Sequence, residues 1–240
     1  MGNYIKVFRH REKQKISVTR NCKRHNVFGK NGVSMENVTW RFSFMEISIL
    51  LFFTWKKNGI LETIHQCLVE KVRESSGKKS EPTVGIIDAQ SVKNTLVSAE
   101  NKGFDAGKKI KGIKRHIIVD TLGLILAVVI QNASMQDRDG AQSVIRQMKE
   151  NWIRVIKIFA DGGYAGKLII IIKQAFNIEL EIIKRSELNS FKILPKRWIV
   201  ERTFAWIDTN RRNSKNYERL NNTSVAMVHL AAIRIMLNRF

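Results

Sequence analysis

From residue 83 onward, short apolar runs of strand length alternate with helical stretches, and this alternation constrains the fold more than any other feature of the sequence. The strand-like runs are residues 84–88, 117–119, 124–130, 155–160 and 180–183. Two of them are separated only by an Asp-Thr-Leu-Gly turn, which predicts a hairpin. The order of strand, hairpin, helix, strand, helix, strand and helix therefore predicts an α/β chain with a mixed sheet flanked by helices.

The helices are predicted from apolar residues spaced three or four positions apart. The predicted helices cover residues 62–73, the stretch that follows residue 136, and residues 165–177, 196–212 and 225–237. The last of these is apolar nearly all round, so we expect a buried helix that closes the domain.

A polar segment over residues 74–82 ends in Pro82 and predicts a domain boundary. Before it, residues 1–80 form a basic, partly helical N-terminal region. After it, residues 83–240 form the main domain.

Two classes of protein are disfavoured by the sequence. The longest apolar stretch, residues 42–55, contains Glu46 and is shorter than the roughly 20 residues that span a bilayer, so no membrane segment is expected. No apolar segment of the kind found in secretory signals follows Met1, and Cys22 and Cys67 lack the spacing of a metal or redox motif. We therefore expect a cytoplasmic protein with reduced thiols.

The net charge points to a polyanionic partner. Lys and Arg number 42 against 21 Asp and Glu, which gives +21 on 240 residues. A basic excess can serve solubility alone, but this one is large for that purpose, and nucleic-acid binding is the favoured interpretation. The middle third is the least positive, with 12 basic and 8 acidic residues in positions 81–160, which indicates a carboxylate-bearing centre between two basic flanks.

Asp88 and Asp161 occupy equivalent places, each at the carboxyl end of an apolar strand-like run. Neighbouring strands can bring such residues together, and two ionised carboxylates stay close only with a cation between them. Their hard oxygen atoms suit Mg²⁺ or Mn²⁺. The competing interpretation is that each aspartate only caps a turn.

Glu201 is a third candidate because it shares a predicted helix face with Trp198 and Phe204. A glutamate on that face is expected to have a partner. The alternative is an ordinary exposed helical glutamate. The other acids have milder explanations, since Asp120 fits a hairpin turn and Asp137 fits a helix start.

The basic residues that are candidates for DNA contact form two groups along the chain, one next to Asp88 and one on both sides of Glu201. They are Lys108, Lys109, Lys111, Lys114 and Arg115 in the first group, and Lys196, Arg197, Arg202, Arg211 and Arg212 in the second. Their position favours contact with phosphates, although a charge run can also be a solvated face. His116 follows the first group and is either a supporting or a purely structural residue.

Five segments together resemble one known family. They are Ile86-Ile87-Asp88-Ala89-Gln90-Ser91-Val92-Lys93, Gly107-Lys108-Lys109-Ile110-Lys111-Gly112, Lys114-Arg115-His116, Ala160-Asp161-Gly162-Gly163-Tyr164-Ala165-Gly166 and Pro195-Lys196-Arg197-Trp198-Ile199-Val200-Glu201-Arg202-Thr203-Phe204-Ala205-Trp206. With these segments the chain resembles the insertion-sequence transposases of the DDE superfamily, in the IS-five-type group, over about residues 55–240.

The resemblance implies a ribonuclease-H-like fold with Asp88, Asp161 and Glu201 as catalytic metal ligands for Mg²⁺ or Mn²⁺. It also implies a DNA transposase that cleaves DNA at the ends of an insertion sequence and transfers the strand to target DNA. Its partner is then double-stranded DNA, on which it acts as a homodimer associated with a bacterial nucleoid.

The N-terminal region departs from this pattern, because residues 1–53 match it poorly. The resemblance implies that this region recognises the element's ends, and the poor match predicts that it is altered. A non-catalytic DNA-binding remnant of a transposase is therefore the alternative function.

Overall fold

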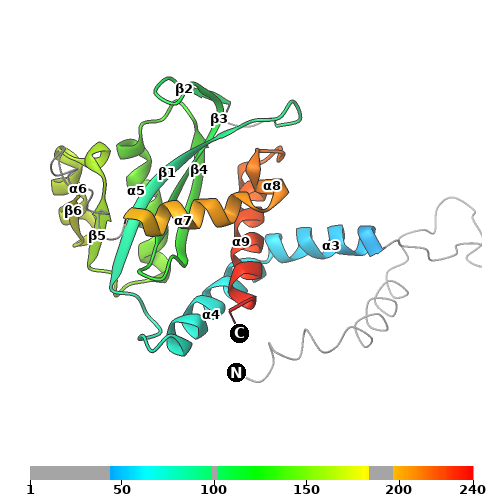
Figure 1. Cartoon of the computed structure of the whole chain (residues 1–240), viewed down its shortest axis with the longest axis horizontal. Helices are drawn as coiled ribbons and strands as arrows, with labels where there is room; N and C mark the ends of the chain where they lie inside the picture. The colour runs from blue at the N-terminus through cyan, green and yellow to red at the C-terminus, as the bar shows by residue number, and fades with distance from the viewer. Residues whose placement is uncertain (1–43, 99–101, 184–196, 240) are drawn as a thin grey trace, which may run out of the picture. The chain divides into compact units, whose positions relative to one another are not determined.

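The computed structural model describes residues 44–98, 102–183 and 197–239 (Figure 1). The chain divides into two units, Met1–Ile49 and Leu50–Phe240. Of the first unit, only the opening residues of helix α3 (Phe44–Lys57) are described. The predicted DNA-end recognition by the N-terminal region thus falls largely outside the described residues.

The second unit is built on a mixed sheet in the order β2-β3-β1-β5-β6, with β4 also paired to β3. β1, β3 and β4 are antiparallel, whereas β5 and β6 run parallel to β1. The strands are β1 (Val84–Lys93), β2 (Gly103–Asp105), β3 (Ile110–Val119), β4 (Ile125–Asn132), β5 (Lys157–Ala160) and β6 (Glu179–Ile182). Three antiparallel strands followed by two parallel ones make the ribonuclease-H-like sheet that the resemblance implies.

Helices cover both faces of this sheet. They are α4 (Ile60–Ser75), α5 (Asp137–Asn151), α6 (Lys167–Phe176), α7 (Arg197–Asp208), α8 (Arg211–Ser214) and α9 (Asn221–Leu237), with a short 3₁₀ turn η2 (Gly162–Tyr164) after β5. α5 packs on β3 and β4, and α7 packs on β1 and β3 (Figure 1). The expected α/β architecture is confirmed, and α9 is the expected buried helix, with residues such as Val228 and Ala226 fully enclosed.

Two predicted elements differ in extent. The single helix expected over residues 196–212 is divided, because the Asn210 side chain donates to the carbonyls of Trp206 and Ile207 and so satisfies the end of α7. The first strand runs on to Lys93 because its polar second half pairs with β3 along its whole length.

The polar segment at residues 74–82 separates α4 from β1 in the sequence but lies within the Leu50–Phe240 unit. α4 packs along α9, and its residues Val69 and Val72 belong to the main hydrophobic core. At its last turn, buried Arg73 pairs with Asp120 of the β3–β4 turn, and Asp120 also accepts the Leu124 amide at 2.8 Å. α4 is therefore an integral part of the domain.

Among the described helices, none combines the length and the apolar character needed to cross a bilayer. Cys67 is an exposed free thiol, and Cys22 lies outside the described residues.

Candidate active site

Two aspartates lie level with each other where β1 and β5 run side by side. The parallel pairing joins Val84 to Lys157 and Ile86 to Phe159, an offset of 73 residues. The same offset relates Asp88 to Asp161, just beyond the last paired residues. Because side chains alternate along a strand, Asp88 emerges on the face of Ile86, and Asp161 follows the same alternation beyond Phe159. The register thus brings the two predicted carboxylates to one place.

Backbone amides hold both carboxylates. Oδ1 of Asp161 accepts the Gly163 amide at 2.9 Å and so starts the η2 turn, while Oδ1 of Asp88 accepts the Ala89 amide at 2.7 Å. The turn function predicted as the alternative for Asp161 is therefore present. It does not compete with a metal role, because a carboxylate has acceptor sites beyond one amide bond.

Asp88 and Asp161 line a small cleft whose walls are apolar, formed by Ile86, Phe159 and Val200 among others. Tyr164, which follows Asp161 in η2, is fully buried beside it. Burial raises the pKa of its phenol well above 10, and the negative charges of Asp88, Asp137 and Asp161 raise it further. The phenol therefore stays protonated and can donate a hydrogen bond among these acids.

Glu201 lies on α7 directly after Val200, which lines the cleft. The expectation that its neighbours Trp198 and Phe204 keep it from being an ordinary exposed glutamate is wrong in one respect, because Glu201 is exposed. Phe204 is buried, but Trp198 is itself 44% exposed, so the face that carries Glu201 is only partly buried.

The donor set fits a hard divalent cation in chemical type, since Asp88 and Asp161 offer only carboxylate oxygens at one cleft. Within the described parts of the chain, however, no three Asp, Glu, His or Cys side chains are gathered closely enough to hold a metal. Asp88 and Asp161 therefore form the candidate centre, with Glu201 on the adjoining helix.

Three of the predicted DNA-contacting lysines are exposed, and one of them, Lys108, reaches the strand beside Asp88. Lys108, Lys109 and Lys111 occupy the turn into β3 and its first residues. Nζ of Lys108 donates at 3.1 Å to the carbonyl of Ala89, the residue next to Asp88. An ammonium group is thus held one residue from a candidate ligand.

Lys114 and Arg115 are buried and engaged within the domain. Nζ of Lys114 lies 2.9 Å from Asp137 and 3.5 Å from Asp105, and it donates to the Met135 carbonyl at 2.7 Å. Its side chain is therefore turned toward internal partners, which leaves it poorly placed for a phosphate.

Arg115 is 2% exposed and donates to Gln90, Asp208 and the Asn213 carbonyl, the last at 2.6 Å. Burial lowers its pKa to about 10, against the opposing effect of Asp208, so the guanidinium stays charged at neutral pH. It links β1 to the end of α7 and to α8.

Arg202 is also engaged internally. Its guanidinium carbon lies 4.5 Å from the ring centroids of both Trp198 and Trp206, and Nη2 donates to the Leu122 carbonyl at 3.1 Å. The two ring contacts lie within α7, and the bond to Leu122 ties this helix, which carries Glu201, to the β3–β4 turn.

Of the remaining basic candidates, two are exposed and two have side chains outside the described residues. Arg211 and Arg212 are exposed on α8, and Nε of Arg212 donates to Glu218 at 3.1 Å. Lys196 and the side chain of Arg197 lie outside the described residues.

His116 is fully buried on the opposite face of the sheet from Asp88, because it pairs with Ala89 in the β1–β3 register. Burial lowers the pKa of its imidazole to about 4, although Asp137 acts in the other direction. A Cβ on Gly140 of α5 would lie 2.2 Å from its ring, so the glycine lets the helix approach. Its position indicates a structural role.

The sequence analysis missed Gln90 and Asp208. Nε2 of Gln90 donates to Asp208 at 2.6 Å, and Gln90 lies two residues from Asp88 on the same strand face. Asp208 lies seven positions after Glu201, a spacing that returns to the same helix face and could have identified it.

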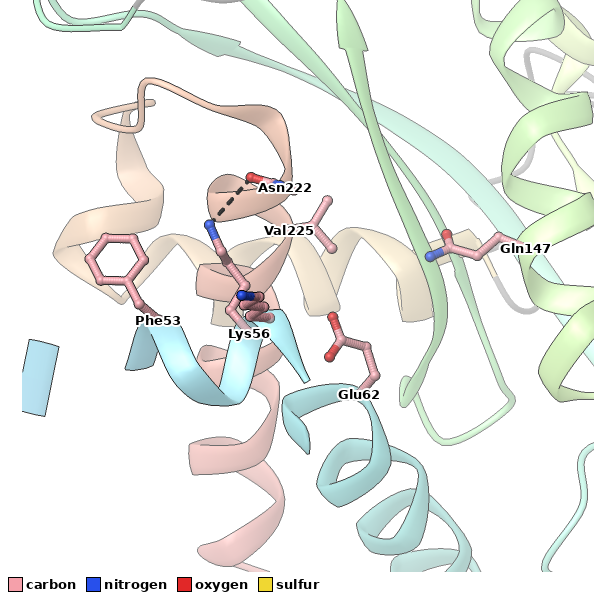
Figure 2. A pocket seen from close by; sticks show the side chains of 7 residues that line it. Phe53, Lys56, Glu62, Gln147, Asn222 and Val225 are labelled. Atoms are coloured by element: carbon pink, nitrogen blue, oxygen red, sulfur yellow. Dashed lines mark hydrogen bonds between the residues drawn. The ribbon is translucent and has the colours of Figure 1, made fainter. Parts of the chain in front are cut away.

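A larger cavity of about 720 Å³ lies apart from these residues (Figure 2). Phe53, Lys56, Glu62, Gln147 and Asn222 are among its lining residues, and Lys56 donates to Asn222 at 3.4 Å. None of the three candidate metal ligands lines it, so it is not the candidate active site.

The family model described as "Transposase DDE domain" matches residues 79–236. A putative transposase for insertion sequence element IS402 from Burkholderia cepacia is 29% identical over 134 residues, which cover 53% of this chain and 64% of that protein. The chain thus spans less than two thirds of the length of this relative.

Solved structures are similar only distantly. The catalytic core of HTLV-2 integrase in complex with magnesium has 15% identity and a TM-score of 0.40, covering 62% of this chain and 84% of that one. The catalytic core of BIV integrase has 9% identity and a TM-score of 0.40, covering 65% and 94%. The Mos1 transposase paired-end complex has 8% identity and a TM-score of 0.28, covering 93% and 70%. At these scores the likenesses carry no argument about the site.

Proposed function

The chain belongs to the transposase DDE domain family, and we propose that it is a DNA transposase that cleaves and transfers DNA strands with a divalent metal. The observation that carries the proposal is the level placement of Asp88 and Asp161 at one cleft. In the proposal these two carboxylates and Glu201 hold Mg²⁺ or Mn²⁺. When bound, such an ion activates the attacking oxygen and stabilises the leaving one in phosphodiester chemistry.

The protein's own groups divide the remaining work. The buried Tyr164 hydroxyl has no hydrogen-bond partner among the described residues, and its raised pKa keeps the proton on the phenol, so it remains available as a donor beside the acids. Gln90 and Arg115 hold Asp208, and Arg202, stacked between Trp198 and Trp206 of its own helix, ties α7 to the Leu122 carbonyl. We assign Arg115 and Arg202 as positioning residues, together with Lys114, rather than as phosphate contacts.

Phosphate contact is proposed for the exposed members of the two basic groups, Lys108, Lys109, Lys111, Arg211 and Arg212. Lys196 and Arg197 stay predicted contacts. The partner is double-stranded DNA, and two subunits joining two ends of an element give a homodimer on DNA. Membership of the IS-five-type group and association with a bacterial nucleoid stay predictions of the resemblance.

The test is strand cleavage by the full chain on plasmid DNA that carries the ends of the element, with Mg²⁺ or Mn²⁺. Asp88→Asn, Asp161→Asn and Glu201→Gln should each lower nicking by at least about a hundredfold and leave DNA affinity within about threefold. A matched control is Glu181→Gln, an exposed strand carboxylate on β6, which should cleave like the wild type.

Unchanged nicking by Asp88→Asn would remove the metal site from the account. DNA binding without any metal-dependent nicking by the wild type is the result expected of a non-catalytic remnant.

A further inference from the structure

The turn that follows β1 presents two apolar side chains to solvent. Leu96 is 102% exposed and Val97 is 57% exposed, whereas Ser98, the next residue, is 1% exposed. Figure 1 shows the chain extending past the sheet after β1. Single exposed apolar residues are ordinary on protein surfaces, but two consecutive ones at the tip of an anchored turn are less so.

A buried asparagine fixes this turn. Asn216, which is 4% exposed, donates at 2.9 Å to both Asn94 and Ser98, and its carbonyl accepts the Thr95 amide at 3.0 Å. Its own amide donates to the Lys93 carbonyl at 2.9 Å. The turn is therefore held in one conformation before any partner arrives, which lowers the entropy lost on binding.

The flanks of the turn are basic. Lys93 and Lys215 are both exposed, and the bridge between Asn94 and Asn216 places the two lysines on adjoining segments. Lys111 also adjoins, since its carbonyl accepts the Asn94 amide at 3.2 Å. An apolar tip between lysines is complementary to DNA, where phosphates border the grooves and the stacked bases are apolar.

The distance between this turn and the candidate active site is short enough for one DNA duplex to span. Lys93 is five residues beyond Asp88 on the same strand, which corresponds to about 17 Å at roughly 3.3 Å per residue. That length matches about five base pairs of B-DNA at roughly 3.4 Å each. One duplex can therefore reach both the cleft and the turn.

We propose that the Leu96-Val97 turn is a wedge that enters a groove of bound DNA and bends the duplex, while Lys93 and Lys215 contact the phosphates on either side. The inference rests on the proposed function only in taking DNA as the partner. A wedge that unstacks base steps favours flexible pyrimidine–purine steps, so the contact would depend on DNA deformability rather than on base identity.

The test is DNA bending by the full chain, measured as energy transfer between dyes on the two ends of a duplex of about 30 base pairs that is rich in TA steps. Saturating wild-type protein should raise the transfer efficiency. Leu96→Ser with Val97→Ser should lose at least half of that rise and weaken binding by about tenfold, the loss expected for an apolar side chain returned to water.

Two controls separate the parts of the wedge. Ile153→Ser removes an apolar side chain that is 68% exposed after α5, and it should bend DNA like the wild type. Lys93→Gln with Lys215→Gln should lower the salt dependence of binding by roughly two counterions and keep the bending at saturation.

Full bending by the Leu96→Ser/Val97→Ser variant would overturn the wedge. Conversion of a dimer to a monomer by that variant, with bending intact, would instead assign the turn to a contact between copies. Asp88→Asn should bend DNA without cleaving it, so a wild-type chain that bends but never cleaves would contradict only the proposed function.

Discussion

Two adjacent residues of β3, Lys114 and Arg115, are both buried cations, but they face opposite sides of the sheet. Arg115 lies on the α7 face with Gln90 and Asp208, and Lys114 lies on the α5 face with Asp105 and Asp137. Arg115 shares its face of the sheet with Asp88, whereas Lys114 shares the opposite face with His116. These two neighbouring charges therefore belong to separate networks and form no single surface.

The largest expected effect is on the arginine face. Arg115→Met should lower the free energy of unfolding by about 3 kcal/mol, because the variant leaves Gln90 and the Asn213 carbonyl without a charged donor. The expected loss is at the low end for a broken buried ion pair, because the Asp208 side chain is 37% exposed and water can solvate it. Urea unfolding measures it, and a loss below about 1 kcal/mol would contradict the proposed linking role.

Lys114→Met should cost less, about 2 kcal/mol, because other donors continue to hold Asp105. Ser91 donates to Asp105, and the Lys108 amide donates to it at 3.0 Å. These bonds and Lys114 lower the pKa of Asp105 to about 2 against the opposing effect of burial, so its stabilisation is complete above about pH 4 and is lost as the pH falls toward 2. In the variant, acid unfolding should begin at a higher pH than in the wild type.

The network on the α5 side of the sheet, that of Lys114, also contains the imidazole of His116. Burial lowers the pKa of His116 to about 4 from 6.5, so the unfolded chain binds more protons between these values and stability falls as the pH drops from 6.5 to 4. From pH 7 to pH 6 the loss from this residue is about 0.7 kcal/mol. His116→Gln should reduce the measured pH-dependent loss by that amount, and an unchanged loss would assign it to buried His65 and His229.

The smallest effect on stability is expected for Lys111→Met, since Lys111 lies on the same strand but is exposed. The free energy of unfolding should change by less than about 0.5 kcal/mol. DNA affinity should fall, and its salt slope should decrease by about one counterion. A large loss of stability in Lys111→Met, with no change in the salt slope of DNA binding, would contradict the assignment of Lys111 to the DNA-contacting cations.

The sequence predicted the succession of strands and helices along the chain because apolar spacing and turn residues are local signals, but it did not predict the short strand β2 in the basic loop before β3. Asp88 and Asp161 were found because each ends an apolar run; Asp161 does follow the end of β5, but Asp88 lies in the middle of β1, and the parallel register brings the two level. The burial of Lys114 and Arg115 could not be predicted, because it depends on the distant partners Asp208 and Asp137. The exposure of Glu201 was not predicted, because helical spacing alone could not show that Trp198, on the same face, is itself partly exposed.

The central claim is that Asp88 and Asp161 share one divalent cation, and Mn²⁺ binding by the full chain tests it most directly. Titration followed by the electron paramagnetic resonance of free Mn²⁺ should show that Asp88→Asn and Asp161→Asn each weaken binding by at least about tenfold. The double variant should lose little more than either single variant, because removing one ligand already removes the shared site. Mn²⁺ affinity that is unchanged in Asp88→Asn, or single losses that simply add, would contradict the account.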